Sequence, residues 1–487
     1  MKGLRKGMSV ASPTSEHPQR IEDSTIQPIP DSERHGKARD LFTIWFGSNI
    51  MVLTIVTGAL ATTVFSQPFW SALVAIVIGN LVGAIFMALH SAQGARLGVP
   101  QMVQTRGQFG SYGSLLVVVI VIIMYVGFFA SNLVLGGQSL SSISSHISTN
   151  TGIVIVGVVS VTATIFGYDL IHAYTRIMTY FSGAVLLLTF VWIVFVHHLP
   201  GDFLTAGHVS AAGFMGTIST AALWQIAYAP YVSDYSRYMP RLTGSRPAFW
   251  ASYTGCSIGS ILPMILGAMI GLAVGGDNVI GGLTTLTSGI AVLVVVVFSI
   301  GIAATNAMNL YCGSLSTLTV GQTLLARWSP KARSRSVIAV LLFGVALILA
   351  LVAQSNFLVN YENFISLLLY VLVPWTAVNL VDYYLVQHGD YDVDEFFRTD
   401  GGRYGRVNWV AIISYLLGIV VEVPFIVTTL YTGPVGKALD GVDLSWIVGV
   451  LVVTPFYYFG AKRFRSAHLA KDRAAVLVAS EPAEEVA

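Results

Sequence analysis

The sequence alternates between apolar runs of about 20 residues and short polar segments over almost its whole length. Runs of about 20 apolar residues are long enough to cross a bilayer as α-helices. The strands of a membrane β-barrel would instead appear as roughly 10-residue segments of alternating hydrophobicity. The runs predict an all-α integral membrane protein with about twelve spans, at residues 41–65, 69–90, 114–140, 150–168, 177–199, 213–233, 248–274, 287–314, 337–354, 359–386, 409–432 and 443–461. We expect the long eighth run to continue as a short interfacial helix near residues 315–325.

The basic residues support this number of crossings. When alternate loops are assigned to the same side as the N-terminus, 25 of the 26 Lys and Arg residues fall on that side, and only Lys437 falls on the other. One span more or less in the middle of the chain would destroy this partition. The positive-inside rule then predicts a multi-pass protein of the plasma membrane with both termini in the cytoplasm.

Composition agrees with a membrane protein. Of the 487 residues, 54% are hydrophobic and 10% are charged, whereas a soluble domain carries about 25% charged residues. The net charge of +2 gives no indication of a nucleic-acid partner. Cys256 and Cys312 both lie in apolar runs and are expected to be small buried hydrophobic residues. The polar segments 1–40 and 466–487 are expected to form cytoplasmic tails, the first of them disordered.

Two spans combine apolar residues with signals that interrupt a helix. The sixth span ends in Trp224–Pro240, with Pro230 where the sequence turns polar, and the first contains small and polar residues at 47–54. An interrupted helix is tolerated in a membrane only where its free backbone groups face protein or water. Interruptions five spans apart predict a five-plus-five inverted repeat, residues 41–200 and 201–386, with two further helices at 387–465. For Ser48, Asn49 and Thr54 the alternative is ordinary polar packing between helices.

These features indicate a secondary transporter. The chain lacks a nucleotide-binding phosphate loop, and its spans offer neither a nucleophile–base pair nor a metal cluster, as a membrane enzyme would need. No repeated ring of like residues suggests a channel. Spans 1, 3, 6 and 8 carry no charged residue near their middles, which favours a neutral substrate over an amino acid.

Several motifs resemble those of the nucleobase–cation symporter-1 family, in particular its purine–cytosine permease branch. They are APYVSDYSRYMP at 229–240, GVPQ at 98–101, RGQFG at 106–110, PWTAVNLVDYY at 374–384 and GRYGRVNW at 402–409. The resemblance implies a leucine-transporter-like fold of five plus five helices with two C-terminal helices added. It also implies uptake of a nucleobase coupled to Na⁺ or H⁺, with no cofactor.

A planar heterocycle requires aromatic faces for stacking and amides that both donate and accept hydrogen bonds. Phe128 and Asn132 in the third span are four residues apart and share a helix face. In the family an aromatic residue, often Trp, is followed four residues later by Asn or Gln. In the sixth span, Trp224 and Gln225 are the predicted contacts, with Tyr228 as the alternative ring.

The eighth span carries Asn306 and Asn309, three residues apart and therefore on one helix face. The resemblance implies that an Asn here contacts the substrate, and Asn49 in the first span is a further candidate contact. For Asn132 the alternative is a packing role, although an unpaired amide in mid-membrane is costly.

The resemblance also implies a Na⁺ site built from first-span backbone carbonyls and eighth-span oxygens. The candidates are Ser48, Met51 and Thr305, but Ala303 and Ala304 stand where other members can carry Ser or Thr. This departure leaves both Na⁺ and H⁺ open as the coupling ion.

Acidic residues that could carry a proton are few. They are Glu362 and Glu422 near span ends, and Asp234 and Asp382 at cytoplasmic ends. Pro230, Asp234 and Arg237 are predicted to form a hinge and gate, with a salt bridge between the last two.

The sequence therefore predicts a nucleobase symporter that is monomeric and works by alternating access in the lipid bilayer. The alternative is a transporter of the same fold for another small neutral heterocycle, such as allantoin, hydantoin, thiamine or uracil.

Overall fold

The computed structural model describes residues 25–166, 168–197, 199, 201–204, 207–275, 278–325, 327–398 and 400–480. The parts of the predicted tails at 1–24 and 481–487 lie outside these residues. Within the described part the chain folds as helices, and its β structure is one isolated antiparallel bridge between Val427 and Thr432.

The chain up to residue 274 forms ten of these helices. They are α1 (Ala38–Asn49), α2 (Val52–Thr63), α3 (Phe69–Leu97), α4 (Gln101–Phe109), α5 (Ser114–Ile143), α6 (Thr149–Phe166), α7 (Tyr168–Trp192), α8 (Ala211–Ile226), α9 (Ala229–Ser236) and α10 (Ser245–Val274). The rest of the chain contains α11 (Val279–Leu286), α12 (Ala291–Leu324), α13 (Ala332–Ala353), α14 (Phe357–Val381), α15 (Trp409–Glu422), α16 (Pro434–Ala438) and α17 (Ser445–Ser480).

Each predicted span coincides with one helix or one broken pair of helices. Among the described residues, seven helices are long and apolar enough to cross a membrane by themselves, and the bent pair α1–α2 makes an eighth crossing. The apolar helices at Thr149–Ile165 and Trp409–Phe425 are shorter. The helix α4, which was not predicted, is completely buried and lies between the second and third predicted spans.

The eighth span differs from the prediction. Instead of a crossing followed by a separate interfacial helix, α12 is one continuous helix of 34 residues, about 50 Å long at 1.5 Å per residue. The residues near 315–325 contain no proline, and Leu315 and Leu318 are buried in the core. With packing on one side and no proline, the helix continues through this segment as far as Leu324.

The first span is broken at the predicted place. The helix α1 ends at Asn49, α2 begins at Val52, and their axes differ by 59°. The N–H of Ile50 turns back to the carbonyl of Gly47 at 3.3 Å instead of continuing the α-helical ladder. Met51 then adopts an extended conformation.

The sixth span is broken one turn after Trp224. Ala227 and Tyr228 separate α8 from α9, and Pro230 occupies the first turn of α9. Proline has no backbone N–H, so the carbonyl one turn earlier cannot receive its usual hydrogen bond. The predicted interruption in this span is therefore present and has the predicted cause.

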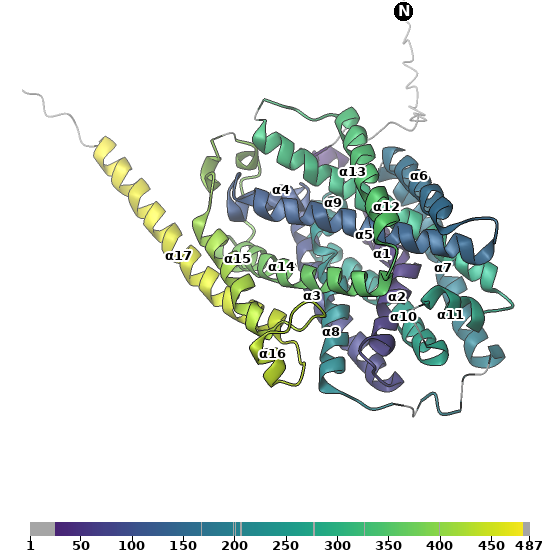
Figure 1. The fold of residues 1–487 in the computed structure, drawn as a ribbon. Coiled ribbons are helices and arrows are strands. Elements are labelled where there is room, and N and C mark those ends of the chain that lie inside the picture. The colour runs from purple at the N-terminus through teal and green to yellow at the C-terminus, as the bar shows by residue number, and fades with distance from the viewer. Residues whose placement is uncertain are drawn as a thin grey trace, which may run out of the picture.

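The helices pack in three groups (Figure 1). The broken helices α1–α2 and α8–α9 pack with α3 and α10. A second group is formed by α5, α6, α12 and α13, and α7 contacts both α1 and α12. The third group, α14, α15 and α17, lies on one flank and reaches the first group through contacts of α14 with α8.

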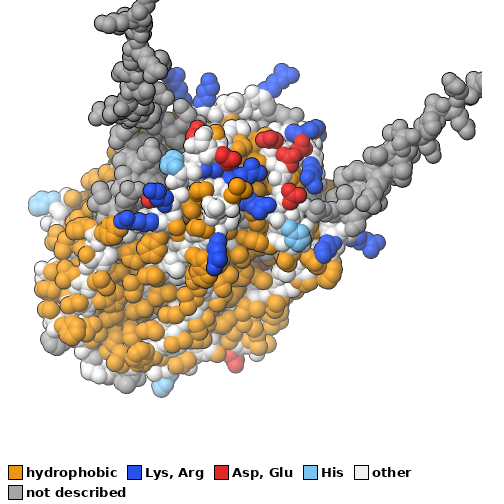
Figure 2. Space-filling view, turned by 180° about the vertical axis from the view of Figure 1, so that it is seen from behind, with side chains coloured by type: hydrophobic (Ala, Val, Ile, Leu, Met, Phe, Trp, Pro, Cys, Tyr) orange, Lys and Arg blue, Asp and Glu red, His pale blue; other side chains and the backbone are white. Residues whose placement is uncertain are grey.

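The molecular surface carries a broad apolar band. Figure 2 shows Lys and Arg side chains gathered at one end of the face in view, above this band. On α13 the apolar side chains that repeat with helical spacing are largely exposed, as expected for a helix that faces lipid.

The prediction that residues 1–40 form a disordered tail is wrong for residues 25–40. Ile26 and Ile29 are buried, and the N–H of Ile29 donates to the carbonyl of Gly98 at 2.9 Å. The guanidinium of Arg34 donates to the carbonyl of Ala95 at 3.2 Å. Two isolated isoleucines give no periodic signal in the sequence, yet they are buried where this segment docks on the ends of α3 and α9.

Candidate functional site

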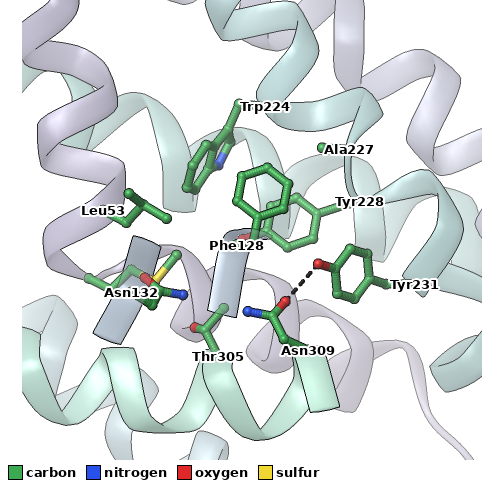
Figure 3. Close-up of a pocket in the computed structure, with 10 residues that line it drawn as sticks. Leu53, Phe128, Asn132, Trp224, Ala227, Tyr228, Tyr231, Thr305 and Asn309 are labelled. Carbon is green, nitrogen blue, oxygen red and sulfur yellow. Dashed lines mark hydrogen bonds between the residues drawn. The ribbon is translucent and has the colours of Figure 1, made fainter. Parts of the chain in front are cut away.

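A small cavity lies where both broken helices meet α5 and α12 (Figure 3). The breaks supply most of its wall, and α5 and α12 supply the rest. The lining residues are Met51, Leu53, Phe128, Asn132, Trp224, Ala227, Tyr228, Tyr231, Thr305 and Asn309.

Aromatic rings form one wall of the cavity. The ring of Phe128 meets that of Trp224 edge to face at a centroid distance of 6.2 Å, and Trp224 meets Tyr228 at 5.9 Å in the same manner. All three side chains are less than 10% exposed. Both alternatives for the sixth-span ring, Trp224 and Tyr228, therefore line the cavity.

Asn132 is the polar group best suited to contact a ligand. Its side chain is fully buried, and neither its Oδ1 nor its Nδ2 has a hydrogen-bond partner among the residues that the structure describes. A buried amide without partners costs free energy. A ligand edge with one donor and one acceptor would satisfy both atoms.

The two amides on α12 have different positions relative to the cavity. Asn309 lines the cavity, where its Oδ1 accepts a 2.6 Å hydrogen bond from the hydroxyl of Tyr231. Asn306 lies behind it and accepts a 3.3 Å hydrogen bond from Nδ2 of Asn309. The sequence analysis did not single out Tyr231. The sequence feature that could have identified it is its position one turn after Tyr228, at the start of α9.

Gln225, a predicted substrate contact, lies outside the cavity lining. Its Nε2 donates to Oδ1 of Asn80 at 2.7 Å and to the carbonyl of Cys256 at 3.3 Å. Successive residues of an α-helix point about 100° apart. Because Trp224 faces the cavity, its neighbour Gln225 faces α3 and α10 instead.

Asn49 is also absent from the lining. Its Oδ1 accepts hydrogen bonds from the indole of Trp224 at 2.7 Å and the hydroxyl of Ser260 at 2.9 Å. Its Nδ2 donates to the carbonyl of Trp45 at 2.6 Å and to the sulfur of Cys256 at 3.4 Å. These bonds use the two donors and two acceptors of the amide, so Asn49 orients a cavity residue from behind.

The candidate cation ligands lie together at the first break. Thr305 and Met51 line the cavity, and the hydroxyl of Thr305 donates to the carbonyls of Ser48 at 2.9 Å and Gly301 at 3.1 Å. Hard cations are held by several oxygen ligands. Here Thr305 brings the hydroxyl and Ala304 brings only a methyl group, so this set of side-chain oxygens is a poor fit to Na⁺.

The predicted gate residues lie on the side of the broken sixth span that leads to the basic loops. The carbonyl of Pro230 accepts a 2.9 Å hydrogen bond from the hydroxyl of Tyr125, and the carboxylate of Asp234 accepts one of 2.9 Å from the N–H of Gln101. Arg237 donates to the backbone carbonyl of Asp234 at 3.2 Å. It also donates to the carbonyl of Thr25 at 2.7 Å and to the hydroxyl of Tyr311 at 3.2 Å.

The remaining acidic candidates lie away from the cavity. Asp382 accepts hydrogen bonds from the hydroxyls of Tyr391 and Tyr457, and thereby ties the end of α14 to α17. Glu362 accepts a 3.3 Å hydrogen bond from the hydroxyl of Ser366, and Glu422 is buried at the end of α15.

The cysteines agree with the sequence analysis. Cys256 and Cys312 are free and buried. Within the described part of the chain, no group of three or more His, Cys, Asp or Glu residues is placed to hold a metal ion.

Comparisons with known proteins agree with this architecture. Residues 28–449 match the model of a family described as permeases for cytosine/purines, uracil, thiamine and allantoin. A putative purine–cytosine permease of Bacillus subtilis, YxlA, is 41% identical over 442 residues, covering 90% of this chain and 95% of that protein. The purine–cytosine permease fcyB of Emericella nidulans is 24% identical and covers 88% of this chain and 86% of its own length.

A solved structure has the same fold. It is MHP1, a nucleobase–cation-symport-1 family transporter, in a closed conformation with bromovinylhydantoin bound. The TM-score is 0.75 at 19% identity, covering 91% of this chain and 96% of the other. Both the family match and the relative at 41% identity extend over most of the chain. The protein is therefore a transporter rather than an enzyme, and it belongs to the family of permeases for cytosine/purines, uracil, thiamine and allantoin.

Proposed function

We propose that the protein imports a nucleobase, cytosine or a purine, by cation-coupled alternating access around the cavity between the two broken helices. The observation that carries this proposal is the amide of Asn132. It is fully buried, it has no partner in the described part of the chain, and it lies beside aromatic rings. Nucleobases combine a flat π-face with an edge that both donates and accepts hydrogen bonds.

The same proposal includes the membrane arrangement. The helices that coincide with the predicted spans would cross the bilayer twelve times as two inverted five-helix repeats and two added helices. Breaks five spans apart support this repeat, and the basic residues gathered at one end support cytoplasmic termini. The protein would act as a monomer in the plasma membrane.

A second candidate substrate is another small neutral heterocycle, such as hydantoin, allantoin, thiamine or uracil. The observation in its favour is the neutrality of the cavity, whose lining contains amides, hydroxyls and rings but no charged side chain. Such a lining accepts any flat neutral ring that offers a donor and an acceptor.

The test is uptake of radiolabelled cytosine into cells that lack their own nucleobase transporters. Unlabelled adenine, hypoxanthine, uracil, allantoin, hydantoin and thiamine compete in turn, and a neutral amino acid serves as the control. We expect saturable uptake that cytosine and purines inhibit and the amino acid does not. Absence of saturable cytosine and purine uptake, with inhibition or uptake of another heterocycle, would replace the first candidate by the second.

A further inference from the structure

One buried acid of the described chain, Glu422, has a carboxyl group without a hydrogen-bond partner. Glu422 is the last residue of α15, and its side chain is fully buried. Neither carboxyl oxygen has a hydrogen-bond partner among the described residues. Isolated charges in an apolar interior are too costly to persist, and such a group is neutral instead.

The packing of α15 holds this carboxyl in place. Gly418, one turn earlier on the same face, is so close to α14 and α17 that an added Cβ would lie 2.7 Å from Pro374 and 2.6 Å from Val453. Beside Glu422 itself, a Cβ on Gly449 of α17 would lie 1.9 Å from Oε1. The carboxyl therefore sits directly against the backbone of α17 at Gly449.

The nearest acid is already fully engaged. Asp443 accepts hydrogen bonds from the N–H of Val427 at 3.0 Å, the hydroxyl of Tyr370 at 2.7 Å, and the N–H and hydroxyl of Ser445 at 2.8 and 2.5 Å. Four donors therefore occupy the oxygens of Asp443, whereas Glu422 has none.

The other titratable groups around Glu422 give it no positive charge. They are Tyr415 on its own helix, Tyr370 and Glu362 on α14, and Asp443 before α17. No Lys or Arg of the described chain forms an ion pair with Glu422. Two carboxyl groups that share such a site do not both ionise readily. Glu422 is therefore the member of the pair that carries a proton.

The helix α14 connects this pair to the cavity. At one position its Phe364 packs edge to face on Phe128 of the cavity wall at 5.3 Å. Less than two turns further along, Tyr370 donates to Asp443. Because one helix carries both contacts, a shift of α14 relative to the cavity would move Tyr370 relative to Asp443 and so alter the surroundings of Glu422.

We propose that Glu422, together with Asp443, forms a proton-binding site. Binding of the proton is linked to the position of α14 against the cavity, and through it to substrate transport. On loading, one proton from water forms the O–H bond of a neutral Glu422 acid; on release, this bond breaks and the carboxylate and the proton are restored. The linkage to transport rests on the proposed function, whereas the proton site itself does not.

The first experiment needs no substrate. Infrared difference spectroscopy of the purified protein detects the C=O stretch of a protonated carboxylic acid, and this band should be present at neutral pH, lost in Glu422→Gln and retained in Glu362→Gln. Glu362 is the matched control because its carboxyl already has the Ser366 hydroxyl as a partner. A spectrum in which Glu422→Gln removes only carboxylate absorption would overturn the proton site, whatever the protein transports.

The second experiment tests the linkage in proteoliposomes. With an inward proton gradient, wild-type protein and Glu362→Gln should accumulate cytosine and acidify the lumen, while Glu422→Gln should lose both and keep exchange of internal for external cytosine. Concentrative uptake by Glu422→Gln equal to wild type would overturn the linkage. If Glu422→Gln does not fold, the wild-type protein alone provides the test. Accumulation of cytosine by wild type without entry of protons would also overturn the linkage. Absence of exchange in wild type would instead count against the proposed function.

Discussion

Asn49 in the break of the first span accepts a 2.7 Å hydrogen bond from the indole N–H of Trp224 in the sixth. This bond joins the two halves of the predicted repeat directly behind the cavity. It fixes the orientation of an aromatic ring that lines the cavity, although Asn49 itself lies outside the lining. The two broken helices therefore shape the cavity together, and neither does so alone.

Asn49→Ala should weaken substrate binding without removing a substrate contact. It leaves the Trp224 indole without its acceptor, at a cost of about 1–3 kcal/mol, and we expect the KM for uptake to rise about tenfold. The measurement is the KM for cytosine. Ser260→Ala is the control, because it removes another donor to the same oxygen and leaves the indole bond intact. Equal effects of the two variants would contradict this role.

Gln225→Ala should act on stability and not on affinity. The substitution removes the donor to Asn80, so an amide oxygen at the contact between α3 and α8 is left unpaired. We expect a lower thermal unfolding temperature in detergent and an unchanged KM, with a loss of about 1–3 kcal/mol in stability. Trp224→Ala, one residue earlier, should raise the KM, because this ring lines the cavity. A large rise in KM for Gln225→Ala would place this side chain in the site after all.

Tyr231→Phe should lower affinity through Asn309. The variant removes only the hydroxyl that donates to Oδ1 of Asn309, so the amide loses its fixed orientation. We expect a KM increase of about threefold to tenfold, from a loss of about 1 kcal/mol. Tyr125→Phe is the matched control, because its hydroxyl donates to the carbonyl of Pro230 and not to a cavity residue. If both variants behave alike, the orientation of Asn309 does not matter.

Replacement of external Na⁺ by choline should leave the initial rate of uptake unchanged. The reason is the oxygen set at the first break, where Thr305 supplies the hydroxyl and Ala303 and Ala304 supply none. A protonophore should reduce accumulation under the same conditions. Uptake that requires Na⁺ and resists the protonophore would show that backbone carbonyls and Thr305 suffice for Na⁺.

The sequence predicted the broken spans because their causes are local. Pro230 removes a backbone donor, and Gly47 with its polar neighbours weakens the first span at the matching place. The cavity residues on α5 were predictable from helical spacing, which places Phe128 with Asn132 on one face, whereas on α12 the predicted Asn306 lies behind Asn309.

Other features depend on tertiary packing that one sequence does not reveal. The sixth span is apolar on nearly all sides, so its pattern could not decide which of Trp224 and Gln225 faces the cavity. The continuous length of α12 and the docking of Ile26 likewise follow from contacts between distant segments.

Equilibrium binding of radiolabelled cytosine to the purified protein shows whether the free amide of Asn132 binds a nucleobase. Gln138→Ala is the control, since this amide lies on the same helix but outside the cavity lining. We expect wild type and Gln138→Ala to bind cytosine in competition with unlabelled adenine or hypoxanthine, and Asn132→Ala to bind it about 10–100-fold more weakly. Wild-type affinity in a folded Asn132→Ala protein would show that this amide does not bind the nucleobase.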